Sequence, residues 1–501
     1  MVKSILLTTT LAMAAGSAQE PAPGPSPTAL RESEAYRLID LPTPPGVQFE
    51  AGALCLMGPD RLAVATRIGE IWIADKILGD PAQPEWKLFE RGLHEVLGLA
   101  EKDGALFATQ RGEVTRMKDT DGDGRADIVE TVGDAWGIDG NYHEYAFGSR
   151  FDPGGNLWVA LCLTGSFTSD NRYRGWALRI SPDGKTIPMN TGIRSPGGIG
   201  FNGNGDVFYT ENQGPWNGAC KLQWLKPGSF AGHPAGLRWF DDPATREAVK
   251  AAGLTKPAEP ESGSRMHGEA KRIPELLPPA VLFPYDKMGQ SAAGIIADGS
   301  GGKFGPFSGQ LFVGDQTQSL VMRVFLEKTP DGQNYQGACF PFREGLASGS
   351  LSLDQGADGS LFVFQTGRGW GSRGGKPFAL QRLVWTGKTP FEIHEMRARP
   401  DGFTLTFTEP VDPASAAAPA SYTMSAYTYI YQSSYGSPEV DTTKPVVERA
   451  DVTADGLSIH LKVNGMIEGH LHELHLPGLR SAKGEALVHP RAYYTLNQLP
   501  K

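Results

Sequence analysis

A motif that recurs six times along the 501-residue chain constrains its fold more than any other feature. Each copy starts with a turn of Asp, Asn or Gly and continues into four or five alternating apolar residues, and a second strand-like run follows it. Alternation with period two is typical of half-buried strands, so each copy contains at least a hairpin. The copies begin at Asp60, Asp103, Gly154, Gly203, Gly309 and Asp358.

The spacing of the copies indicates how they are arranged. Four of the intervals span 43 to 51 residues, and one spans 106. A period of about 40–50 residues with several strands per repeat is typical of propeller blades. The long interval could contain a seventh blade, but residues 231–290 are rich in Pro, Glu and Lys and include a helix-like stretch near 243–253, which favours an insertion over one face. We therefore expect an all-β fold with a six-bladed β-propeller over residues 37–388.

The composition changes near residues 388–392, and the pattern beyond them differs from the repeats. Runs such as GFTLTFTEP and LSIHLKV alternate with period two over about 110 residues, which is the size of a small sandwich. The sequence predicts a C-terminal β-sandwich of the immunoglobulin or fibronectin III kind over residues 389–501. Its tyrosines could form a sugar-stacking surface or simply pack the sandwich; they are Tyr422, Tyr427, Tyr429, Tyr431 and Tyr435.

The N-terminal residues predict export. Lys3 precedes a short apolar stretch and a small-residue run that ends at Ala18, so residues 1–18 are predicted to be a cleaved signal peptide. Residues 19–36 form a Pro-rich leader that we expect to be extended and mobile. The expected location is secreted or periplasmic, and no other segment is apolar enough to predict a transmembrane helix.

The net charge and the cysteine content limit the classes of partner and cofactor that the chain is expected to bind. The net charge is −9 and there is no basic run, which excludes nucleic-acid binding as an expected function. The four cysteines fit no metal or haem motif. Because export permits disulfides, we expect one or two of them, with the pairing left open.

An acidic loop within the second repeat predicts a calcium site. Residues 119–130 fill the pattern D-x-D-x-D-G-x5-E, in which alternating carboxylates converge on one hard cation. All ligands come from one loop, so we expect a structural Ca²⁺ clip rather than a catalytic centre. The predicted ligands are Asp119, Asp121, Asp123, Arg125 through its backbone carbonyl, Asp127 and Glu130.

Polar and aromatic clusters precede or follow the predicted strands, where blade loops meet the rim or the central channel of a propeller. His143, between Tyr142 and Glu144, has the chemistry of a proton acceptor near neutral pH, although a histidine beside Tyr and Glu is more often structural. A second cluster begins at Arg194, and a third spans residues 211–217.

The run RSPGGIGFNGNGDVFYTENQGPWNGACKLQWLKPGSFAGHP resembles the soluble glucose/sorbosone dehydrogenase family. The run NYHEYAFGSRFDPGGNLWVAL, together with the Asp-rich loop, resembles the secreted dehydrogenase-like propellers of planctomycete and verrucomicrobial bacteria. The resemblance covers roughly residues 40–388. It implies a six-bladed propeller that oxidises a sugar or polyol with pyrroloquinoline quinone and passes electrons to an external acceptor.

The resemblance also implies roles for residues of this chain. His143 matches the base, with Tyr142 and Glu144 beside it, and Arg194 matches an arginine that holds the quinone. Gly214 and Pro215 match a turn whose carbonyls bind calcium. Further residues are expected to contact cofactor or substrate: Asn212, Arg368 and Arg373 the cofactor, and Trp216 and Trp370 the sugar.

The sequence departs from the family pattern near these positions. Ser195 stands where the family has Asn, and residues 217–220 replace an acidic pair that would complete the calcium site. Three functions therefore remain open: a quinone-dependent sugar or polyol dehydrogenase, a polysaccharide- or glycoside-cleaving lyase or hydrolase, and a non-catalytic glycan- or protein-binding module.

Overall fold

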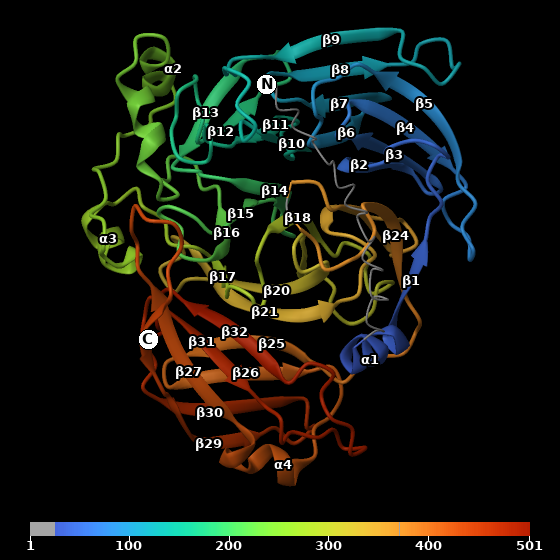
Figure 1. Cartoon of the computed structure of the whole chain (residues 1–501). Helices are drawn as coiled ribbons and strands as arrows, with labels where there is room; N and C mark the ends of the chain where they lie inside the picture. Colours follow the sequence, from blue (N-terminus) through green and yellow to red (C-terminus); the bar gives the residue numbers. More distant parts are fainter. Residues whose placement is uncertain (1–25, 370) are drawn as a thin grey trace, which may run out of the picture.

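The computed structural model describes residues 26–369 and 371–501 (Figure 1). The described chain is mostly β, as predicted. Before residue 386 its strands form antiparallel groups of four, one group per repeat. The groups are β2 (Ala51–Gly58), β3 (Arg61–Thr66), β4 (Glu70–Asp75) and β5 (Glu85–Arg91); β6 (Gly98–Lys102), β7 (Ala105–Thr109), β8 (Val114–Lys118) and β9 (Ile128–Gly133); β10 (Ala146–Phe151), β11 (Leu157–Leu161), β12 (Trp176–Ile180) and β13 (Thr186–Thr191); β14 (Pro196–Phe201), β15 (Val207–Glu211), β16 (Cys220–Trp224) and β17 (Val281–Phe283); β18 (Ala292–Ala297), β19 (Leu311–Asp315), β20 (Leu320–Lys328) and β21 (Tyr335–Arg343); and β22 (Ser350–Gln355), β23 (Leu361–Thr366) and β24 (Phe378–Trp385) with β1 (Tyr36–Asp40).

The first strands of these groups form a closed ring. β2, β6, β10, β14, β18 and β22 contact one another in this cyclic order, and β22 returns to β2. The strands come so close that a Cβ at Gly98 would overlap the backbone of Gly148 on the neighbouring strand. Only about 30 Å³ of space remains at the axis, lined by residues of all these strands. The propeller-type ring is therefore packed through its middle, and its axis leaves no room for a ligand.

The beginning of the described chain closes the ring. β1 pairs antiparallel with β24 and becomes the outer strand of the β22–β24 group. α1 (Pro27–Ala35) precedes it; Ser26 caps this helix by accepting a hydrogen bond from the Ala29 N–H, and Glu32 is buried. The expectation of an extended leader is thus wrong for residues 27–35, because a cap, a helical Pro and buried contacts stabilise a helix there. The predicted signal peptide lies outside the described residues.

The long interval between repeats contains three short helical segments: η1 (Pro234–Phe240), α2 (Arg246–Ala251) and α3 (Met266–Arg272). The predicted insertion over residues 231–290 extends too far, since β17 lies within it. β17 pairs with β16, with Cys220 opposite Phe283, and supplies the fourth strand of its group.

The C-terminal residues form two further sets of four strands. One sheet has the order β25 (Ile393–Arg399), β26 (Gly402–Phe407), β30 (Ser458–Asn464) and β29 (Val446–Val452). The other set, β32 (Arg491–Leu496), β31 (His470–His475), β27 (Thr423–Tyr429) and β28 (Glu439–Thr443), continues the β18–β21 sheet because β32 pairs with β21. Two short helical segments, α4 (Pro413–Ala417) and η2 (Pro419–Ser421), lie between β26 and β27.

One hydrophobic cluster joins this C-terminal part to the ring. Phe325 on β20 and Phe340 on β21 pack in the same cluster as Phe403 and Leu461 of the C-terminal sheet. The C-terminal strands are therefore fixed to the ring by a shared core as well as by the β21–β32 ladder.

The four cysteines, Cys55, Cys162, Cys220 and Cys339, are buried and free, so the expectation of one or two disulfides is wrong. Each packs among apolar side chains as a small hydrophobic residue. Among the described residues, no helix combines the length and apolar character that crossing a membrane requires.

Candidate functional site

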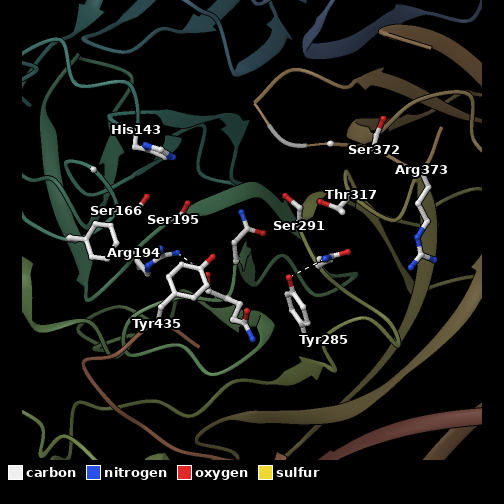
Figure 2. A pocket seen from close by; sticks show the side chains of 16 residues that line it. His143, Ser166, Arg194, Ser195, Tyr285, Ser291, Thr317, Ser372, Arg373 and Tyr435 are labelled. Atoms are coloured by element: carbon white, nitrogen blue, oxygen red, sulfur yellow. Dashed lines mark hydrogen bonds between the residues drawn. The ribbon is translucent and has the colours of Figure 1, made fainter. Parts of the chain in front are cut away.

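A pocket of about 630 Å³ lies at the end of the ring where the first strands begin and the second strands end (Figure 2). Its size is within the usual range for small-molecule sites. It draws residues from four neighbouring groups and from the C-terminal part. The lining residues are His143, Gly165, Ser166, Phe167, Arg194, Ser195, Asn212, Gln213, Tyr285, Gln290, Ser291, Thr317, Gly371, Ser372, Arg373 and Tyr435.

Two buried carboxylates hold the loops on the pocket floor. Glu211, the last residue of β15, accepts hydrogen bonds from the backbone N–H groups of Arg194 and Ser195. Asp315, the last residue of β19, accepts them from the N–H groups of Gln290 and Ser291, both at 2.8 Å. Each pair of residues directly precedes the first strand of its group. Two repeats thus share one feature, a buried carboxylate that accepts two backbone N–H groups. These hydrogen bonds fix the backbone from which the side chains of the two pairs enter the pocket.

Glu211 is balanced by a buried cation. Lys221 Nζ lies 2.9 Å from Glu211 Oε2, and both side chains are only 1% exposed. Lys221 also donates to the carbonyl of Ala231, and Tyr209 donates its hydroxyl to Glu211 Oε2 at 2.9 Å. A buried ion pair of this kind is costly to break, because a charge left without its partner stays desolvated.

Arg194 brings a positive charge to the pocket wall. Its Nη1 donates to the carbonyl of Gln213 at 3.0 Å, while its guanidinium lies beneath the rings of Tyr435 and Phe167, 5.3 and 5.9 Å from their centroids. Its Nε is buried and has no hydrogen-bond partner among the described residues. A Cβ at Gly214 would overlap this guanidinium, so glycine is required beneath it.

His143 lies at the same pocket, in the loop before β10. The ring is half-buried, and its backbone N–H donates to Asn141 Oδ1 at 3.0 Å. Burial lowers the pKa of His143, and the positive charges of Arg194 and Arg111 lower it further. The imidazole is therefore neutral at pH 7 and can accept a proton.

The charged side chains among the described lining residues of the pocket are all positive. Arg194 and Arg373 line it, and no described lining residue is Asp or Glu. The remaining polar lining comes from hydroxyl and amide side chains such as Ser291 and Asn212. Such a set can bind an anionic group and hydrogen-bond to hydroxyls, but it offers no carboxylate to hold a cation.

Two residues beside His143 do not act with it in this pocket. Glu144 is fully buried, and it accepts hydrogen bonds from the Asp139 N–H, the Thr164 hydroxyl and the Asn171 amide at 2.7–2.8 Å. Glu144 was expected to transfer protons together with His143. This expectation is wrong, because these hydrogen bonds occupy both of its carboxylate oxygens. Tyr142 is 46% exposed and packs its ring edge-on against His143 without lining the pocket.

The Gly214–Pro215 turn lies next to the pocket but faces the C-terminal part. The carbonyl of Gly214 accepts backbone N–H groups from Asn217 and Gly436, which use both of its lone pairs. Its expected role as a calcium-binding carbonyl is therefore corrected. Pro215 forms a β-bridge with Tyr435.

The remaining predicted ligands divide between the pocket and other surroundings. Asn212 and Arg373 line the pocket. Arg368 instead pairs with Glu50 at 3.0 Å. Trp216 packs edge-on against Tyr431, which removes it from the expected sugar contact. Trp370 lies outside the described residues.

The acidic loop connects β8 to β9, away from the pocket lining. Carboxylate oxygens of Asp119, Asp121 and Asp127 lie within 4.8 Å of one another. Glu130 forms an ion pair with Arg116 across the β8–β9 ladder instead of joining them. The carboxylates of Asp119 and Asp123 accept backbone N–H groups of the loop, including those of Gly124 and Arg125.

Several residues that line the pocket were not predicted from the sequence. Gln290 and Ser291 occupy the same place in their repeat as Arg194 and Ser195, so an alignment of the repeats would have found them. Tyr435 was one of five tyrosines without a distinguishing signal. The other four are at most 8% exposed, as the packing interpretation expects, whereas Tyr435 is 61% exposed.

The structure is similar to several solved enzymes. The PQQ-bound form of aldose sugar dehydrogenase from Streptomyces coelicolor is 17% identical, covers 70% of this chain and 98% of its own, and has a TM-score of 0.49. The PQQ domain of pyranose dehydrogenase from Coprinopsis cinerea, in its holo form, is 13% identical with coverage of 70% and 95% and a TM-score of 0.47. A likeness of this degree does not transfer a substrate or a cofactor.

No curated protein matches the sequence. A family model described as a domain of unknown function, DUF7133, matches residues 65–364, which is more than half of the chain. The match includes β4 to β22 and the residues from His143 to Thr317 that line the pocket. The chain therefore belongs to the DUF7133 family.

Proposed function

We propose that this protein is an exported, six-bladed propeller enzyme that oxidises a hydroxyl group of a sugar or polyol, with an anionic quinone of the pyrroloquinoline type as hydride acceptor. One observation carries the proposal: His143, kept neutral, and the cationic Arg194 line one pocket that has no described acidic residue. The motif resemblance of residues 141–148 and 194–217 to soluble sugar dehydrogenases supports it.

The pocket residues fit such a quinone. The cofactor carries carboxylates, and Arg194 and Arg373 supply positive charge without a competing acid. The Nε of Arg194 is buried and lacks a hydrogen-bond partner among the described residues, so the protein's own acceptors do not satisfy this part of the guanidinium. Hydroxyl groups of Ser291 and Thr317 are further donors, whereas the Ser372 hydroxyl donates to the carbonyl of Gly374. When bound, the quinone supplies an electrophilic carbonyl that can take up a hydride.

The chemistry assigned to this chain is proton removal and orientation. His143 accepts the proton of the substrate hydroxyl at its neutral ring nitrogen, which favours loss of hydride from the attached carbon and formation of a carbonyl. The guanidinium of Arg194 is held by Gln213 and by the aromatic rings above it, so its charge is already oriented when a ligand binds.

Calcium is not part of the proposed active site. The Gly214 carbonyl is already occupied by two N–H groups, and the described lining residues offer no carboxylate. We propose Ca²⁺ only at the β8–β9 loop, as a structural clip in which Asp119, Asp121 and Asp127 supply the first ligands.

The same pocket chemistry weighs against hydrolysis. Most glycoside hydrolases use a pair of carboxyl groups flanking the scissile bond, and the described lining residues contain none. A pure binding module stays possible as an outcome of the test below.

The proposal is tested on purified full-length protein. We expect pyrroloquinoline quinone to bind at micromolar concentration, and a panel of aldoses and polyols to reduce an artificial acceptor in its presence. His143→Gln should reduce oxidation to a small residual rate while quinone binding remains, and Arg194→Gln should weaken quinone binding. His460→Gln, at the partly exposed His460–Asp401 pair, is the matched control and should change neither. Absence of quinone binding, or binding without oxidation of any substrate, would reject the proposal.

A further inference from the structure

One wall of the pocket comes from the C-terminal part of the chain. The segment 430–438 between β27 and β28 reaches the ring, and its Tyr435 lines the pocket together with Tyr285 (Figure 2). The structure thus combines residues almost 300 positions apart, from His143 to Tyr435, in one cavity.

Backbone hydrogen bonds fix this segment on the ring. The Trp216 N–H donates to the Gln432 carbonyl at 2.6 Å, and the Gly436 N–H donates to the Gly214 carbonyl at 3.1 Å. On its other side, Tyr431 exchanges backbone hydrogen bonds with Gly263 and Ser264 at 2.9 and 3.1 Å.

The fit at the tip of the segment is close. Gly436 has φ +63°, and a Cβ there would lie 2.8 Å from Cδ of Gln213. Another residue would strain the left-handed backbone and displace the end of the Gln213 side chain. Tyr435 is therefore held in place by its neighbours on both sides rather than carried on a free loop.

The ring of Tyr435 is nevertheless open to solvent. It is 61% exposed, and its one described cationic neighbour is Arg194, 5.3 Å from its centroid. Phe167 and Tyr285, in the same lining, are 57% and 37% exposed. The hydroxyl of Tyr285 accepts a hydrogen bond from Gln290 Nε2 at 3.0 Å, which orients that ring. Exposed aromatic rings gathered in one pocket leave apolar surface in contact with water, which is unfavourable. A ligand that packs on the rings removes this surface from water.

We infer that the C-terminal part supplies a carbohydrate-stacking wall of this pocket and that Tyr435 is a specificity-determining residue that packs against a saccharide ring. A saccharide presents apolar C–H faces bordered by hydroxyls. The pocket matches both features with aromatic rings beside amide and hydroxyl groups such as Gln213 and Ser291. The inference rests on the proposed function for its substrate class, but it concerns binding and is testable without turnover.

The experiment compares the full-length protein with Tyr435→Ala, Tyr435→Phe and a control, Val446→Ala, on the 59% exposed Val446 of β29. Binding of a panel of mono- and oligosaccharides is measured by calorimetry, quinone binding by absorbance, and KM and kcat for any substrate oxidised. We expect Tyr435→Ala to weaken saccharide binding and raise KM by about 3- to 10-fold with kcat and quinone affinity retained. Tyr435→Phe and Val446→Ala should behave like the wild type.

The outcomes separate this inference from the proposed function. If saccharides bind and Tyr435→Ala weakens them but no oxidation occurs, the wall is supported and the dehydrogenase is rejected. If sugars are oxidised and Tyr435→Ala leaves KM and affinity unchanged, Tyr435 only covers Arg194 and the inference is overturned. If no saccharide binds to the wild type, the inference is also overturned. If Tyr435→Ala weakens quinone binding as much as saccharide binding, the ring supports the Arg194 site and is no specificity determinant.

Discussion

At the residue scale, the position of Arg194 depends on the buried carboxylate of Glu211. That carboxylate accepts the N–H groups of Arg194 and Ser195 and is neutralised by Lys221. The network connects β16 to the loop before β14. A change that unbalances the buried charges therefore also alters the geometry of the pocket floor.

Replacing Lys221 with Met should therefore destabilise the protein strongly. The side chain stays comparable in size, but Glu211 would be left charged and buried, which costs about 3–5 kcal/mol. Chemical denaturation should show a lower midpoint for Lys221→Met. The double variant Lys221→Met/Glu211→Gln, which keeps an acceptor for the two N–H groups and removes the unpaired charge, should recover part of the loss. A double variant less stable than the single one would contradict this account.

The lowered pKa of His143 predicts the pH dependence of oxidation. A base must be neutral to accept a proton, so kcat/KM should be level near pH 7 and fall only below a pKa that lies under the ordinary value of about 6.5. Arg194→Gln, assayed at saturating cofactor, removes one of the charges that lower this pKa and should move the acid limb to higher pH.

The pH profile has an internal control. His143→Gln should leave a residual rate without the acid limb. A wild-type limb centred at or above pH 7, or an Arg194→Gln profile shifted to lower pH, would exclude His143 as the titrating base.

At the element scale, the β8–β9 connection is predicted to gain stability from Ca²⁺. Asp119, Asp121 and Asp127 lie close together and repel one another until a cation binds. After treatment with chelator, Ca²⁺ at 100 times its Kd should stabilise the fold by about 2.7 kcal/mol. The measurement is the apparent Tm with and without Ca²⁺.

Variants at two exposed turns make this test specific. Asp119→Asn should remove the Ca²⁺-dependent rise in Tm, whereas Asp183→Asn, in the turn between β12 and β13, should retain it. Absence of any Ca²⁺-dependent change in the wild type, or its retention in Asp119→Asn, would show that the acidic loop is only a solvated turn.

The element scale also shows what the sequence could and could not predict. The recurring motif identified the second strand of every group, because each copy combines a turn residue with period-two alternation, as in β11 and β23. It did not identify β17 or α1, since Val281–Phe283 is too short for a periodic signal and the Pro residues near α1 resemble a linker. Both elements are stabilised by tertiary contacts that local patterns do not record.

At the scale of the whole molecule, the site was predictable only in part. His143 and Arg194 follow from motifs within one half of the chain, and the closed ring brings them to one pocket. Tyr435 enters from beyond residue 389 through contacts made by the 430–438 segment, and no local pattern distinguishes it from Tyr431. The occupied carbonyl of Gly214 has the same origin, because its partner Gly436 comes from that segment.

The ends of the described chain meet at a buried charged cluster. His489, in the loop before β32, contacts Glu32 of α1 through Nε2 at 2.8 Å and Glu392 through Nδ1 at 2.6 Å. Arg343, at the end of β21, lies 3.2 Å from the other oxygen of Glu32. The cluster connects the N-terminal helix, the ring and the C-terminal part, so its charge state should affect the stability of the whole protein.

Burial alone would lower the pKa of His489, but the carboxylates of Glu392 and Glu32 outweigh it and raise the pKa to about 9. The ordinary value in an unfolded chain is about 6.5, so the folded protein binds more protons between these two pH values. The stabilisation is therefore complete below about pH 6.5 and is lost as the pH rises through 9.

We accordingly expect the free energy of unfolding to fall by on the order of 3 kcal/mol from pH 6.5 to pH 9, measured by urea denaturation across that range. His489→Gln should be less stable at pH 6.5 and should lose most of this slope, because the neutral amide binds no proton. His460→Gln, which removes a partly exposed histidine paired with Asp401, should keep the slope of the wild type. A wild-type stability independent of pH in this range, or an unchanged slope in His489→Gln, would mean that the cluster is held together without the charge of His489, and that the contact between α1 and the C-terminal part depends on its other interactions, such as the Arg343–Glu32 ion pair.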